Sequence, residues 1–447
     1  MVNKKVEART PSGFLELLPK DQIIFNWMFG QIKSIFELFG YLPIETPAVE
    51  LKEVLMAKGG GETEKQVYGL ASRAGDTGMC LHFDLTVPLA RYVVEHFNEL
   101  TFPFRRYQMQ KVWRGERAQK GRYREFYQCD IDVIGTNNPL TDAEIPSVIY
   151  EVFKRLRIPK FTIGLNNRKF ISGVFEEISK EGSTKEFLTI VDKLDKIGET
   201  EVRDQLVGLG VETTDANFII RLLSFKGNYS ELMDKFSDWK FSNQLVRDGL
   251  SELEAVYNGV LSFGVPSDYV RIDLSVARGL DYYTGTVYET LLDDFPKVGS
   301  ICSGGRYDDL CKYYTDKNLP GVGISIGLSR LFSQLKEAEL LPNIPQYISS
   351  VLVVGLDDSS RKRCMEVANE LRESGISCEV YFEIAKLKKQ LKYANDLGIP
   401  FVVLISAEEL ESKLVGLKDM TTGLQQQVSV EEAISFCSNF SESLEAL

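Results

Sequence analysis

The chain has 447 residues, of which 44% are hydrophobic and 26% are charged, and this composition is ordinary for a globular protein of about two to four domains. Its formal net charge is -12, so a surface that binds nucleic acid must be a local basic patch on an acidic body. No apolar run reaches about 18 residues and the first residues lack an apolar stretch, so we expect neither a membrane span nor a signal peptide.

The first part of the chain alternates between helical and extended patterns. Apolar residues recur at helical spacing over 21–39, and Gly40 follows as a stop signal. The next segment, YLPIETPAVE at 41–50, is extended because two prolines within it resist a helix. Residues 102–135 alternate aromatic, apolar and basic side chains, which predicts two strands joined by a loop, and 141–157 has a helical pattern.

The middle of the chain changes character and then returns to strands. Residues 170–260 are rich in Lys, Glu, Leu and Ser at helical spacing, which predicts a mostly helical insertion. Strand-like patterns return at 269–290 and 297–303. The glycine-punctuated strand GVGISIG at 321–327 leads into a helix from about 328 to 341.

Two prolines within 341–350 separate a last region, in which apolar strands alternate with helices in a βαβαβ pattern. This pattern predicts an independent α/β domain with a buried sheet. The chain then divides into four parts: the first part of an α+β core, a helical insertion, the second part of the core and the C-terminal domain, at 1–165, 166–262, 263–342 and 343–447.

The segment FRRYQMQKVWRGERAQKGRYREFYQCDID contains eight Lys and Arg residues between positions 105 and 124, against the single acid Glu116. Because side chains alternate along a strand, Arg114 at one strand end and Arg122 or Arg124 on the return strand can reach one face. Arginine forks suit phosphate and carboxylate oxygens. The alternative is a solvated edge hairpin with ordinary surface charges.

Two glycine-containing segments follow the insertion. In ARGLDYYTGTVYE, 277–289, the adjacent tyrosines project to opposite faces if the chain is extended, so one could serve the core and the other a pocket. A hairpin turn at Gly279 and Gly285 is the alternative. In SGGRYDDL, 303–310, the paired glycines allow either close backbone approach to a ligand or a tight turn before a helix.

Two further segments carry possible ligand-binding side chains. In HFDLTVPLARY, 82–92, Asp84 and Thr86 on one strand face could meet an ammonium group, or they could be an N-cap pair before a helix. In GVGISIGLSRLF, 321–332, small residues on a strand admit a flat ligand such as a nucleotide base. Arg330 falls in the first helical turn, where a salt-bridged surface arginine is the alternative interpretation.

Cysteine and histidine usage bears on compartment and metal binding. The seven cysteines are scattered and odd in number, which argues against a disulfide framework and favours a reducing, cytoplasmic compartment. The chain has only two histidines, His82 and His96, and no C-x-x-C pair. We therefore expect no structural zinc site and assign no metal ligand among the protein side chains.

Taken together and in this order, these segments resemble the class II aminoacyl-tRNA synthetases, and specifically the histidyl-tRNA synthetase family. YLPIETPAVE is similar to motif 1, which forms the dimer, the basic segment to motif 2, and GVGISIGLSRLF to motif 3. RGLDYYTG and SGGRYDDL resemble the two peptides peculiar to the histidine enzymes. The resemblance extends from Gly13 to the C-terminal domain and is weakest in the insertion.

This resemblance implies a class II synthetase-like antiparallel sheet with flanking helices, a helical insertion and a C-terminal α/β anticodon-binding domain. It implies a cytoplasmic homodimer that activates L-histidine with ATP to histidyl-adenylate and pyrophosphate, and then transfers histidine to the 3′ end of tRNA-His, releasing AMP. The alternative is a non-catalytic synthetase paralogue that acts as a regulatory subunit or tRNA sensor. Retention of Arg114, Arg278 and Arg330, and the presence of the C-terminal domain, argue against that alternative.

The resemblance implies a set of histidine-binding residues. The α-amino group would be held by Asp84, Thr86 and Gln128. The imidazole would be bound by Asp132 and Tyr283, with Tyr282 in the same site. An acid at position 132 stabilises a ring N–H donor, and it rejects apolar competitors because they leave a buried carboxylate unpaired.

The resemblance also implies an ATP site and two catalytic arginines. Arg114 would grip the α-phosphate and the histidine carboxylate, and Arg278 would lie opposite it, where relatives use a metal ion. Arg330 would take the γ-phosphate, and the rest of the site would be lined by Glu116, Arg122 and Tyr123. Mg²⁺ would accompany the β- and γ-phosphates.

Contacts with tRNA are implied at two places. Arg117 and Gln119, in the loop of the basic segment, would contact the acceptor end and the extra 5′ nucleotide of tRNA-His. The C-terminal domain would read the anticodon. A helix of this domain would contact phosphates or present a solvated face through Lys386, Lys388, Lys389 and Lys392.

Overall fold

The computed structural model describes residues 6–57, 66–117, 121–178, 183–191, 194–239, 242–276, 283–383 and 385–445. These residues form two compact units. The larger unit comprises Phe25–Pro342 with the segment that ends at Glu16, and the smaller comprises Asn343–Leu447 with Leu17–Ile24. Among the helices described, none combines the length and the hydrophobicity that crossing a bilayer requires.

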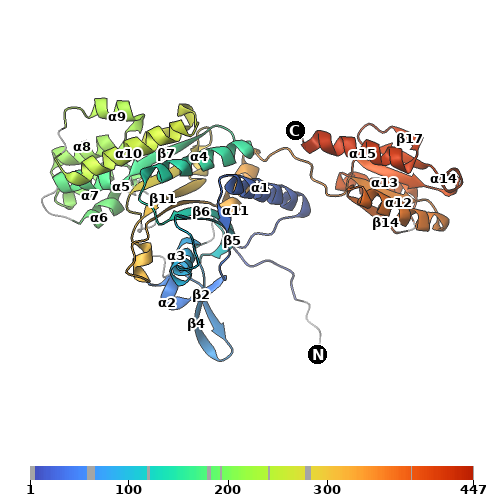
Figure 1. Cartoon of the computed structure of the whole chain (residues 1–447), viewed down its shortest axis with the longest axis horizontal. Helices are drawn as coiled ribbons and strands as arrows, with labels where there is room; N and C mark the ends of the chain where they lie inside the picture. The colour runs from blue at the N-terminus through green and yellow to red at the C-terminus, as the bar shows by residue number, and fades with distance from the viewer. Residues whose placement is uncertain are drawn as a thin grey trace. The chain divides into compact units, whose positions relative to one another are not determined.

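A nine-stranded sheet is the centre of the larger unit as described (Figure 1). Neighbouring strands from β5 to β7 are antiparallel, whereas β1 pairs with β5, and β9 with β7, in parallel. The strand order is β1 (Leu42–Pro43), β5 (Phe104–Trp113), β6 (Glu125–Ile134), β12 (Gly321–Ile326), β11 (Cys302–Tyr307), β10 (Thr286–Leu292), β7 (Phe161–Asn167), β9 (Val270–Asp273) and β8 (Lys226–Gly227). The predicted strand pair over 102–135 is thus confirmed as β5 and β6.

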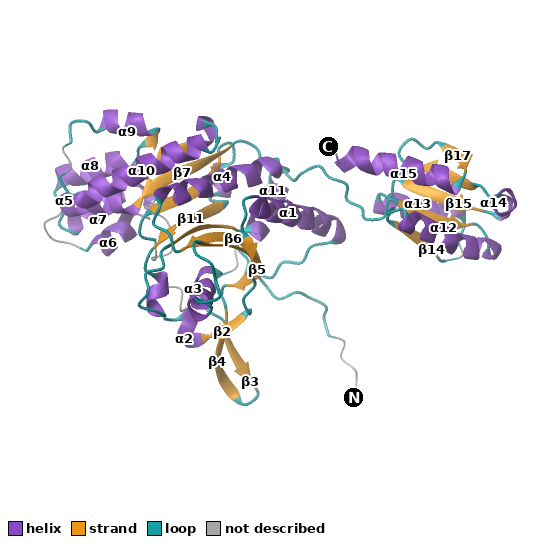
Figure 2. Ribbon diagram, in the orientation of Figure 1, coloured by secondary structure: helices purple, strands orange, loops and turns teal. Residues whose placement is uncertain are grey.

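Helices pack on the sheet, as Figure 2 shows. The residues that α4 and α11 bury are mostly apolar. The predicted first helix is confirmed as α1 (Pro19–Leu38), and the ring of its Phe25 packs 5.6 Å from that of Phe332 in α11 (Leu328–Glu337). Asn138 caps α4 (Pro139–Arg155), and Pro139 begins it without losing a hydrogen bond. Helix α4 covers the face of the sheet that carries the buried Arg306 side chain, which pairs with Asp142.

The segment after β7 is mostly helical, as predicted. Its helices are α5 (Arg168–Ile178), α6 (Thr184–Val191), α7 (Leu194–Gly208), α8 (Thr213–Leu223), α9 (Tyr229–Lys235) and α10 (Gln244–Ser262). The short strand β8 returns from this segment to the edge of the central sheet, where it pairs with β9. The boundaries 166–262 of a separate insertion domain stay a prediction.

A small three-stranded sheet lies beside the first strand of the core. Its order is β2 (Val49–Leu51), β4 (Gly75–Leu81) and β3 (Gly69–Ser72), with α2 (Lys52–Leu55) between β2 and β3 along the chain. The expected extended conformation of 41–50 is confirmed, since this segment supplies β1 and β2. Helix α3 (Thr86–Glu95) follows β4 after a short irregular link.

The smaller unit has a five-stranded sheet, and its predicted βαβαβ pattern is confirmed. Strands β14 (Cys378–Tyr381), β13 (Val351–Gly355) and β15 (Phe401–Ile405) are parallel, and β16 (Val415–Asp419) and β17 (Gln425–Val428) continue the sheet in antiparallel fashion. Val351 and Val353 face one core while Leu352 and Val354 face the other, which explains the continuous apolar run. The helices are α12 (Arg361–Glu373), α13 (Leu387–Leu397), α14 (Ala407–Ser412) and α15 (Val430–Glu445).

Candidate active site

A cavity of about 340 Å³ opens on the central sheet, on the face opposite α4. It is lined by residues from β6, β11 and β12, from the start of α3 and from the start of α11. Segments that are far apart in sequence therefore meet here. The predicted site residues that line it are Asp84, Thr86, Arg114, Glu116, Arg122, Tyr123, Gln128, Asp132, Tyr283 and Arg330.

Other predicted residues are not brought into this cavity or cannot be placed. Arg117 is exposed and is not among the described residues that line the cavity. Arg124 donates to the carbonyl oxygens of Glu116 and Ser12. Of the two arginines it is Arg122 that lines the cavity, and it does so from the segment before β6 rather than from the return strand itself. Arg278, Tyr282 and Gln119 lie outside the described residues.

Strand alternation places the deepest polar side chains of the cavity. Gln128, Asp130 and Asp132 are two residues apart on β6, so all three project from the same face. The neighbouring strand β12 sets Gly323 opposite Asp132. A Cβ atom at Gly323 would collide with the Asp132 carboxylate, so glycine is what makes room for this acid.

Asp132 is held by two buried partners that the sequence did not suggest. Its Oδ2 lies 2.6 Å from Nη2 of Arg106, and the hydroxyl of Tyr307 donates to its Oδ1 at 2.5 Å. Burial raises the pKa of Asp132 to about 6, while Arg106 and Tyr307 act to lower it. The hairpin register pairs Arg106 directly with Asp132, and this cross-strand pairing of opposite charges was the signal available in the sequence.

Asp130 is a further acid that sequence reasoning missed. It is 2% exposed, lines the cavity and lies in register with Ser325 of β12. Burial raises its pKa to about 7, opposed mainly by Arg106 and reinforced by the nearby Asp132. This end of the cavity therefore gathers carboxyl groups that a cationic or N–H-rich ligand would stabilise.

Asp84 and Thr86 line the cavity but not from a strand. The chain is irregular at Asp84, and α3 begins at Thr86. The backbone N–H of Val87 donates to Oδ1 of Asp84 at 3.1 Å, so Asp84 satisfies a donor at the start of α3. The strand-face interpretation was wrong. The alternative of an N-cap pair was wrong in its positions, because the N-cap residue is Leu85 and Thr86 is the first residue of the helix, although Asp84 does accept from Val87. Both side chains still reach the cavity.

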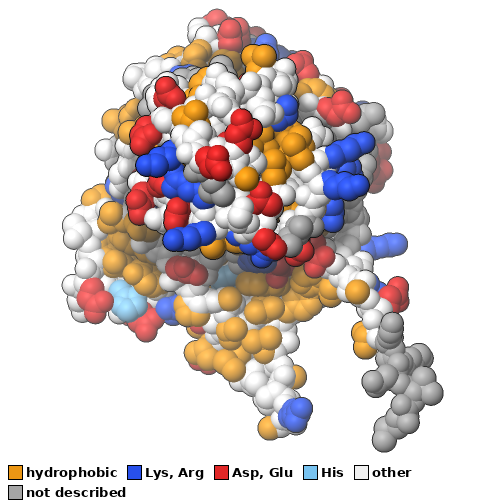
Figure 3. Space-filling model, turned by 90° about the vertical axis from the view of Figure 1, so that its right-hand side faces the viewer, with side chains coloured by type: hydrophobic (Ala, Val, Ile, Leu, Met, Phe, Trp, Pro, Cys, Tyr) orange, Lys and Arg blue, Asp and Glu red, His pale blue; other side chains and the backbone are white. Residues whose placement is uncertain are grey.

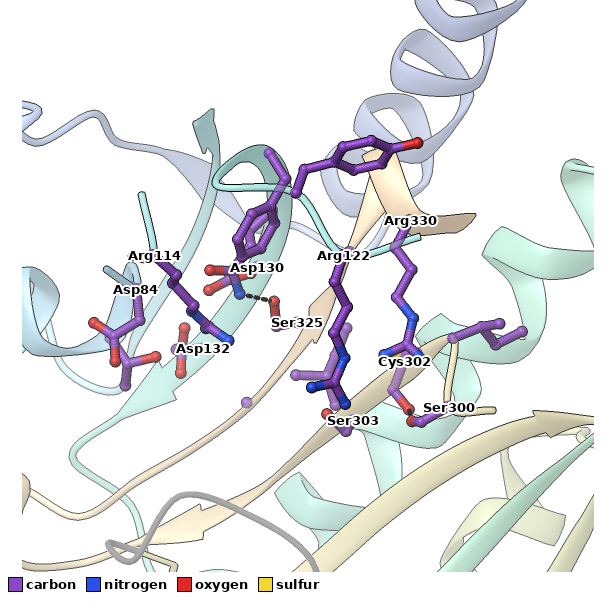
Figure 4. A pocket seen from close by; sticks show the side chains of 18 of the residues that line it. Asp84, Arg114, Arg122, Asp130, Asp132, Ser300, Cys302, Ser303, Ser325 and Arg330 are labelled. Atoms are coloured by element: carbon purple, nitrogen blue, oxygen red, sulfur yellow. Dashed lines mark hydrogen bonds between the residues drawn. The ribbon is translucent and has the colours of Figure 1, made fainter. Parts of the chain in front are cut away.

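Arginines occupy the rest of the cavity. Nε of Arg114 donates to the carbonyl oxygen of Phe83 at 3.0 Å, and its guanidinium lies 5.2 Å from the centre of the Phe126 ring. Arg330, in the first turn of α11, donates to the carbonyl oxygen of Val298 at 3.3 Å. In Figure 4, Asp84, Asp132 and Arg114 lie toward one end of the cavity, and Arg122 and Arg330 lie toward the other.

The alternative interpretation of the basic segment as a solvated edge hairpin was wrong. Strand β5 has β1 on one side and β6 on the other, so the hairpin lies within the sheet. Arg122 is exposed, whereas the other arginines that line the cavity, Arg114 and Arg330, are half-buried. The side chain of Arg122 is 57% exposed and lies 3.7 Å from Glu116.

The paired glycines of SGGRYDDL are not in a turn, so that alternative was wrong, and neither glycine is among the described residues that line the cavity. Gly304 and Gly305 lie within β11, between β10 and β12. A Cβ atom at Gly305 would lie 2.9 Å from Cδ1 of Tyr283, so this glycine makes room for the Tyr283 ring. Arg168 donates to the carbonyl oxygen of Tyr283 at 3.1 Å, which fixes the backbone there.

The described part of the chain contains no preformed metal centre. No cluster of three or more His, Cys, Asp or Glu side chains there is arranged to hold a metal ion. His82 is buried and bonded through Nε2 to the carbonyl oxygen of Lys111 at 2.7 Å, whereas His96 is partly exposed beside Glu99.

Known proteins resemble the chain over nearly its whole length. A family model described as histidyl-tRNA synthetase matches residues 13–331, and one described as an anticodon binding domain matches residues 350–440. The histidine--tRNA ligase of Clostridium tetani is 50% identical over 430 residues, covering 96% of this chain and 97% of that protein. That of Stenotrophomonas maltophilia is 48% identical, covering 95% and 96%. The crystal structure of histidyl-tRNA synthetase from Nostoc superposes with a TM-score of 0.89 at 40% identity, covering 97% of this chain and all of that one.

An antiparallel sheet that carries an arginine-lined cavity on one face, followed by a separate anticodon-binding domain, is the architecture of a class II aminoacyl-tRNA synthetase. The family model that matches residues 13–331 and the relatives agree on the branch within that class. The chain belongs to the histidyl-tRNA synthetase family.

Proposed function

We propose that the chain activates L-histidine with ATP to form histidyl-adenylate and pyrophosphate, and then transfers histidine to the 3′ end of tRNA-His. The observation that carries this proposal is one cavity in which buried carboxyl groups and several arginines are brought together. Family membership and relatives that are about half identical over the full length support the same activity.

Histidine binds at the carboxyl-rich end. Asp84, Thr86 and Gln128 supply oxygens for the three N–H donors of the α-ammonium group. Asp132 and Tyr283 bind the imidazole, and Tyr282 belongs to the same site. Because these acids are buried, an apolar amino acid of similar size would leave a carboxylate unpaired, which disfavours it strongly.

ATP binds at the arginine end, and no protein nucleophile is needed. A carboxylate oxygen of histidine attacks the α-phosphorus, the bond to the β-phosphate breaks, and pyrophosphate leaves. Negative charge gathers on the phosphoryl oxygens, and Arg114, held by the Phe83 carbonyl, is preorganised to stabilise it. Arg278 is the second catalytic arginine.

The remaining groups of the arginine end position ATP. Arg330 binds the γ-phosphate, and Glu116, Arg122 and Tyr123 line the nucleotide site. Mg²⁺ would be brought by ATP and would offset part of the charge of its phosphates. Among the carboxylates of the cavity, Glu116 is the one beside Arg122 and partly open to solvent, so it is the side chain that could face such an ion.

The tRNA is held at two places. Arg117, exposed beyond the cavity, and Gln119 contact the acceptor end, whose terminal hydroxyl attacks the adenylate carbonyl and releases AMP. In the anticodon-binding domain, the start of α13 is a phosphate-contact element. Its exposed cations are Lys386, Lys388, Lys389 and Lys392.

The chain functions as a homodimer in the cytoplasm. Support for the dimer comes from exposed apolar side chains on β1, β2 and β4, where Leu42, Val49, Leu51 and Met79 are 36–58% exposed. Figure 3 shows hydrophobic side chains gathered above the projecting hairpin of β3 and β4. Strand β1 is also an open edge of the central sheet, which a second copy would cover.

Gel filtration with light scattering tests the dimer at micromolar concentration. Leu51→Asp should shift the protein toward monomer, whereas Leu424→Asp, a matched change at an exposed leucine of the smaller unit, should leave the mass unchanged. A wild-type monomer would contradict the dimer.

The activity is tested by ATP–pyrophosphate exchange with each of the proteinogenic amino acids. Exchange with histidine alone, followed by charging of tRNA-His, is expected. Absence of exchange in a folded sample would favour the alternative, a non-catalytic paralogue that senses tRNA or regulates another enzyme.

A further inference from the structure

We propose that Arg106 is a positioning residue that ties together the two halves of the histidine site and anchors them to the 41–50 segment. This inference rests on the proposed function. The juxtaposition that carries it is one buried guanidinium in contact with Asp132, with the backbone between Asp84 and Thr86, and with Gln108.

The contacts of Arg106 join the two halves directly. Its side chain is fully buried, at 0% exposure. Nη2 lies 2.6 Å from Oδ2 of Asp132 and donates to the carbonyl oxygen of Leu85 at 3.3 Å. Leu85 stands between the two residues that hold the ammonium group, and Asp132 binds the imidazole. One guanidinium therefore sets the separation between the ammonium and imidazole subsites.

Arg106 acts through these neighbours because it is not one of the described residues that line the cavity. A buried arginine with a carboxylate partner is costly to disturb, since removal of either charge leaves the other unpaired. The planar fork also constrains orientation in a way that an ammonium group does not. Asp132 is thus presented to the substrate in a fixed orientation before histidine binds.

The other side of Arg106 leads to the segment expected at the dimer interface. Nη1 of Arg106 donates to Oε1 of Gln108 at 3.3 Å, and Nε2 of Gln108 donates to Oγ1 of Thr46 at 2.9 Å. Gln108 and Thr46 are buried, at 0% and 2% exposure. Gln110 extends the connection by donating to the Thr46 carbonyl oxygen at 2.8 Å. The histidine site is therefore fastened to the loop between β1 and β2.

The first experiment measures the KM for histidine and for ATP in pyrophosphate exchange with full-length Arg106→Met and Arg106→Lys. Asp132 loses a charge-assisted hydrogen bond in Arg106→Met, so this variant should raise the histidine KM by about 10-fold or more. The ATP KM should stay within about 2-fold, because the contacts of Arg106 with described residues are to Asp132, Leu85 and Gln108, away from the arginine end. Arg106→Lys should restore part of the loss, since it returns the charge without the fork.

Arg105→Met is the matched control. Arg105 is the adjacent arginine on β5, but it points to the other face, where it pairs with Glu144 and donates to the Phe39 carbonyl oxygen at 2.9 Å. Its loss should lower stability without changing the ratio of the two KM values. The proposal would be overturned if Arg106→Met raised the histidine KM and the ATP KM by the same factor, as Arg105→Met is expected to do if it changes them at all. Arg106 would then have a structural role only.

Gln108→Leu and Thr46→Val decide the matter if the Arg106 variants do not fold. Each removes one link and keeps a similar volume, so each should raise the histidine KM by about 3-fold with the ATP KM unchanged. In the double variant the two effects should not add, because the second link is already lost. Unchanged histidine KM in folded Gln108→Leu would overturn the proposal. Wild-type exchange with histidine in the same assay tests the activity itself, so the two failures are distinguishable.

Discussion

The two ends of the active-site cavity are built in opposite ways. At the histidine end, Asp130 and Asp132 are 2–3% exposed, and Asp132 already has partners in Arg106 and Tyr307. At the proposed ATP end, the side chain of Arg122 is 57% exposed and lies 3.7 Å from Glu116. The proposed histidine end is thus formed in advance, whereas Arg122 at the proposed ATP end remains open to solvent.

This difference follows from the chemistry of the ligands. A buried hydrogen-bond acceptor distinguishes an imidazole from an apolar ring. It disfavours the apolar ligand only if water cannot reach the acceptor and replace the missing hydrogen bond. A polyphosphate brings its own strong charge, so exposed guanidinium groups can meet it without a prior partner. Discrimination therefore requires burial, and attraction of ATP does not.

The largest effect is expected where the two ends meet, at Arg114. Arg114→Ala should slow adenylate formation by about 10³-fold, because a fixed donor to the developing phosphoryl charge is removed. Single-turnover formation of histidyl-adenylate measures this rate, and far-UV circular dichroism checks the fold. Arg155→Ala on the surface of α4 serves as a control and should react at the wild-type rate. A similar rate for Arg114→Ala would mean that Arg114 only positions the cavity.

Gly323→Ala should disturb the preformed end. The added methyl group would collide with the Asp132 carboxylate, so the strand or the acid must shift. We expect the free energy of unfolding to fall by about 1–3 kcal/mol and the histidine KM to rise more than the ATP KM. Urea denaturation and pyrophosphate exchange measure the two effects. Gly30→Ala, in α1 with nothing within 4 Å of the new atom, should instead be neutral or slightly stabilising.

Most of the architecture could be predicted because it rests on local periodicity. The apolar spacing of 21–39 gave α1, and the alternation over 102–135 gave the pair β5 and β6. The pairing of strands distant in sequence was beyond such patterns. The order that sets β6 beside β12, and so brings Arg330 to the same cavity as Asp132, depends on tertiary packing.

The site residues also fall into two groups: those that sequence motifs predict and those that depend on tertiary packing. Side chains that resemble family motifs, such as Arg114 and Gln128, were predicted and do line the cavity. The sequence did not single out three residues: Asp130, Arg106 and Tyr307. Their roles depend on the side chains that contact them from other strands, and not on a pattern in their own segments. Gly305 was noticed but assigned to a turn or a ligand, since only the structure shows the Tyr283 ring beside it.

Arg122→Ala tests the open end with a smaller effect. The ATP KM should rise by about 5–10-fold, because one phosphate-facing charge is lost, while the histidine KM stays unchanged. Stability should hardly change, since exposed ion pairs such as that with Glu116 contribute about 0–1 kcal/mol. Exchange rates against ATP concentration and a thermal melt give both numbers. A parallel rise in the histidine KM would show that the two ends are coupled and do not bind their ligands independently.

The pH dependence of stability probes the buried end by itself. Burial raises the pKa of Asp130 to about 7 and that of Asp132 to about 6, from an ordinary 3.8, despite Arg106 and with Asp84 nearby. Between pH about 4 and 7 the folded, ligand-free protein therefore keeps protons that the unfolded chain releases, so these groups make stability fall as pH rises. Asp130→Asn removes one such group. The free energy of unfolding of the variant should therefore rise relative to that of the wild type as the pH increases across this range. Denaturation at several pH values gives the free energy of unfolding of each protein. If this free energy changes with pH in the same way for both proteins, Asp130 ionises normally, and the buried end is less isolated from water than its geometry indicates.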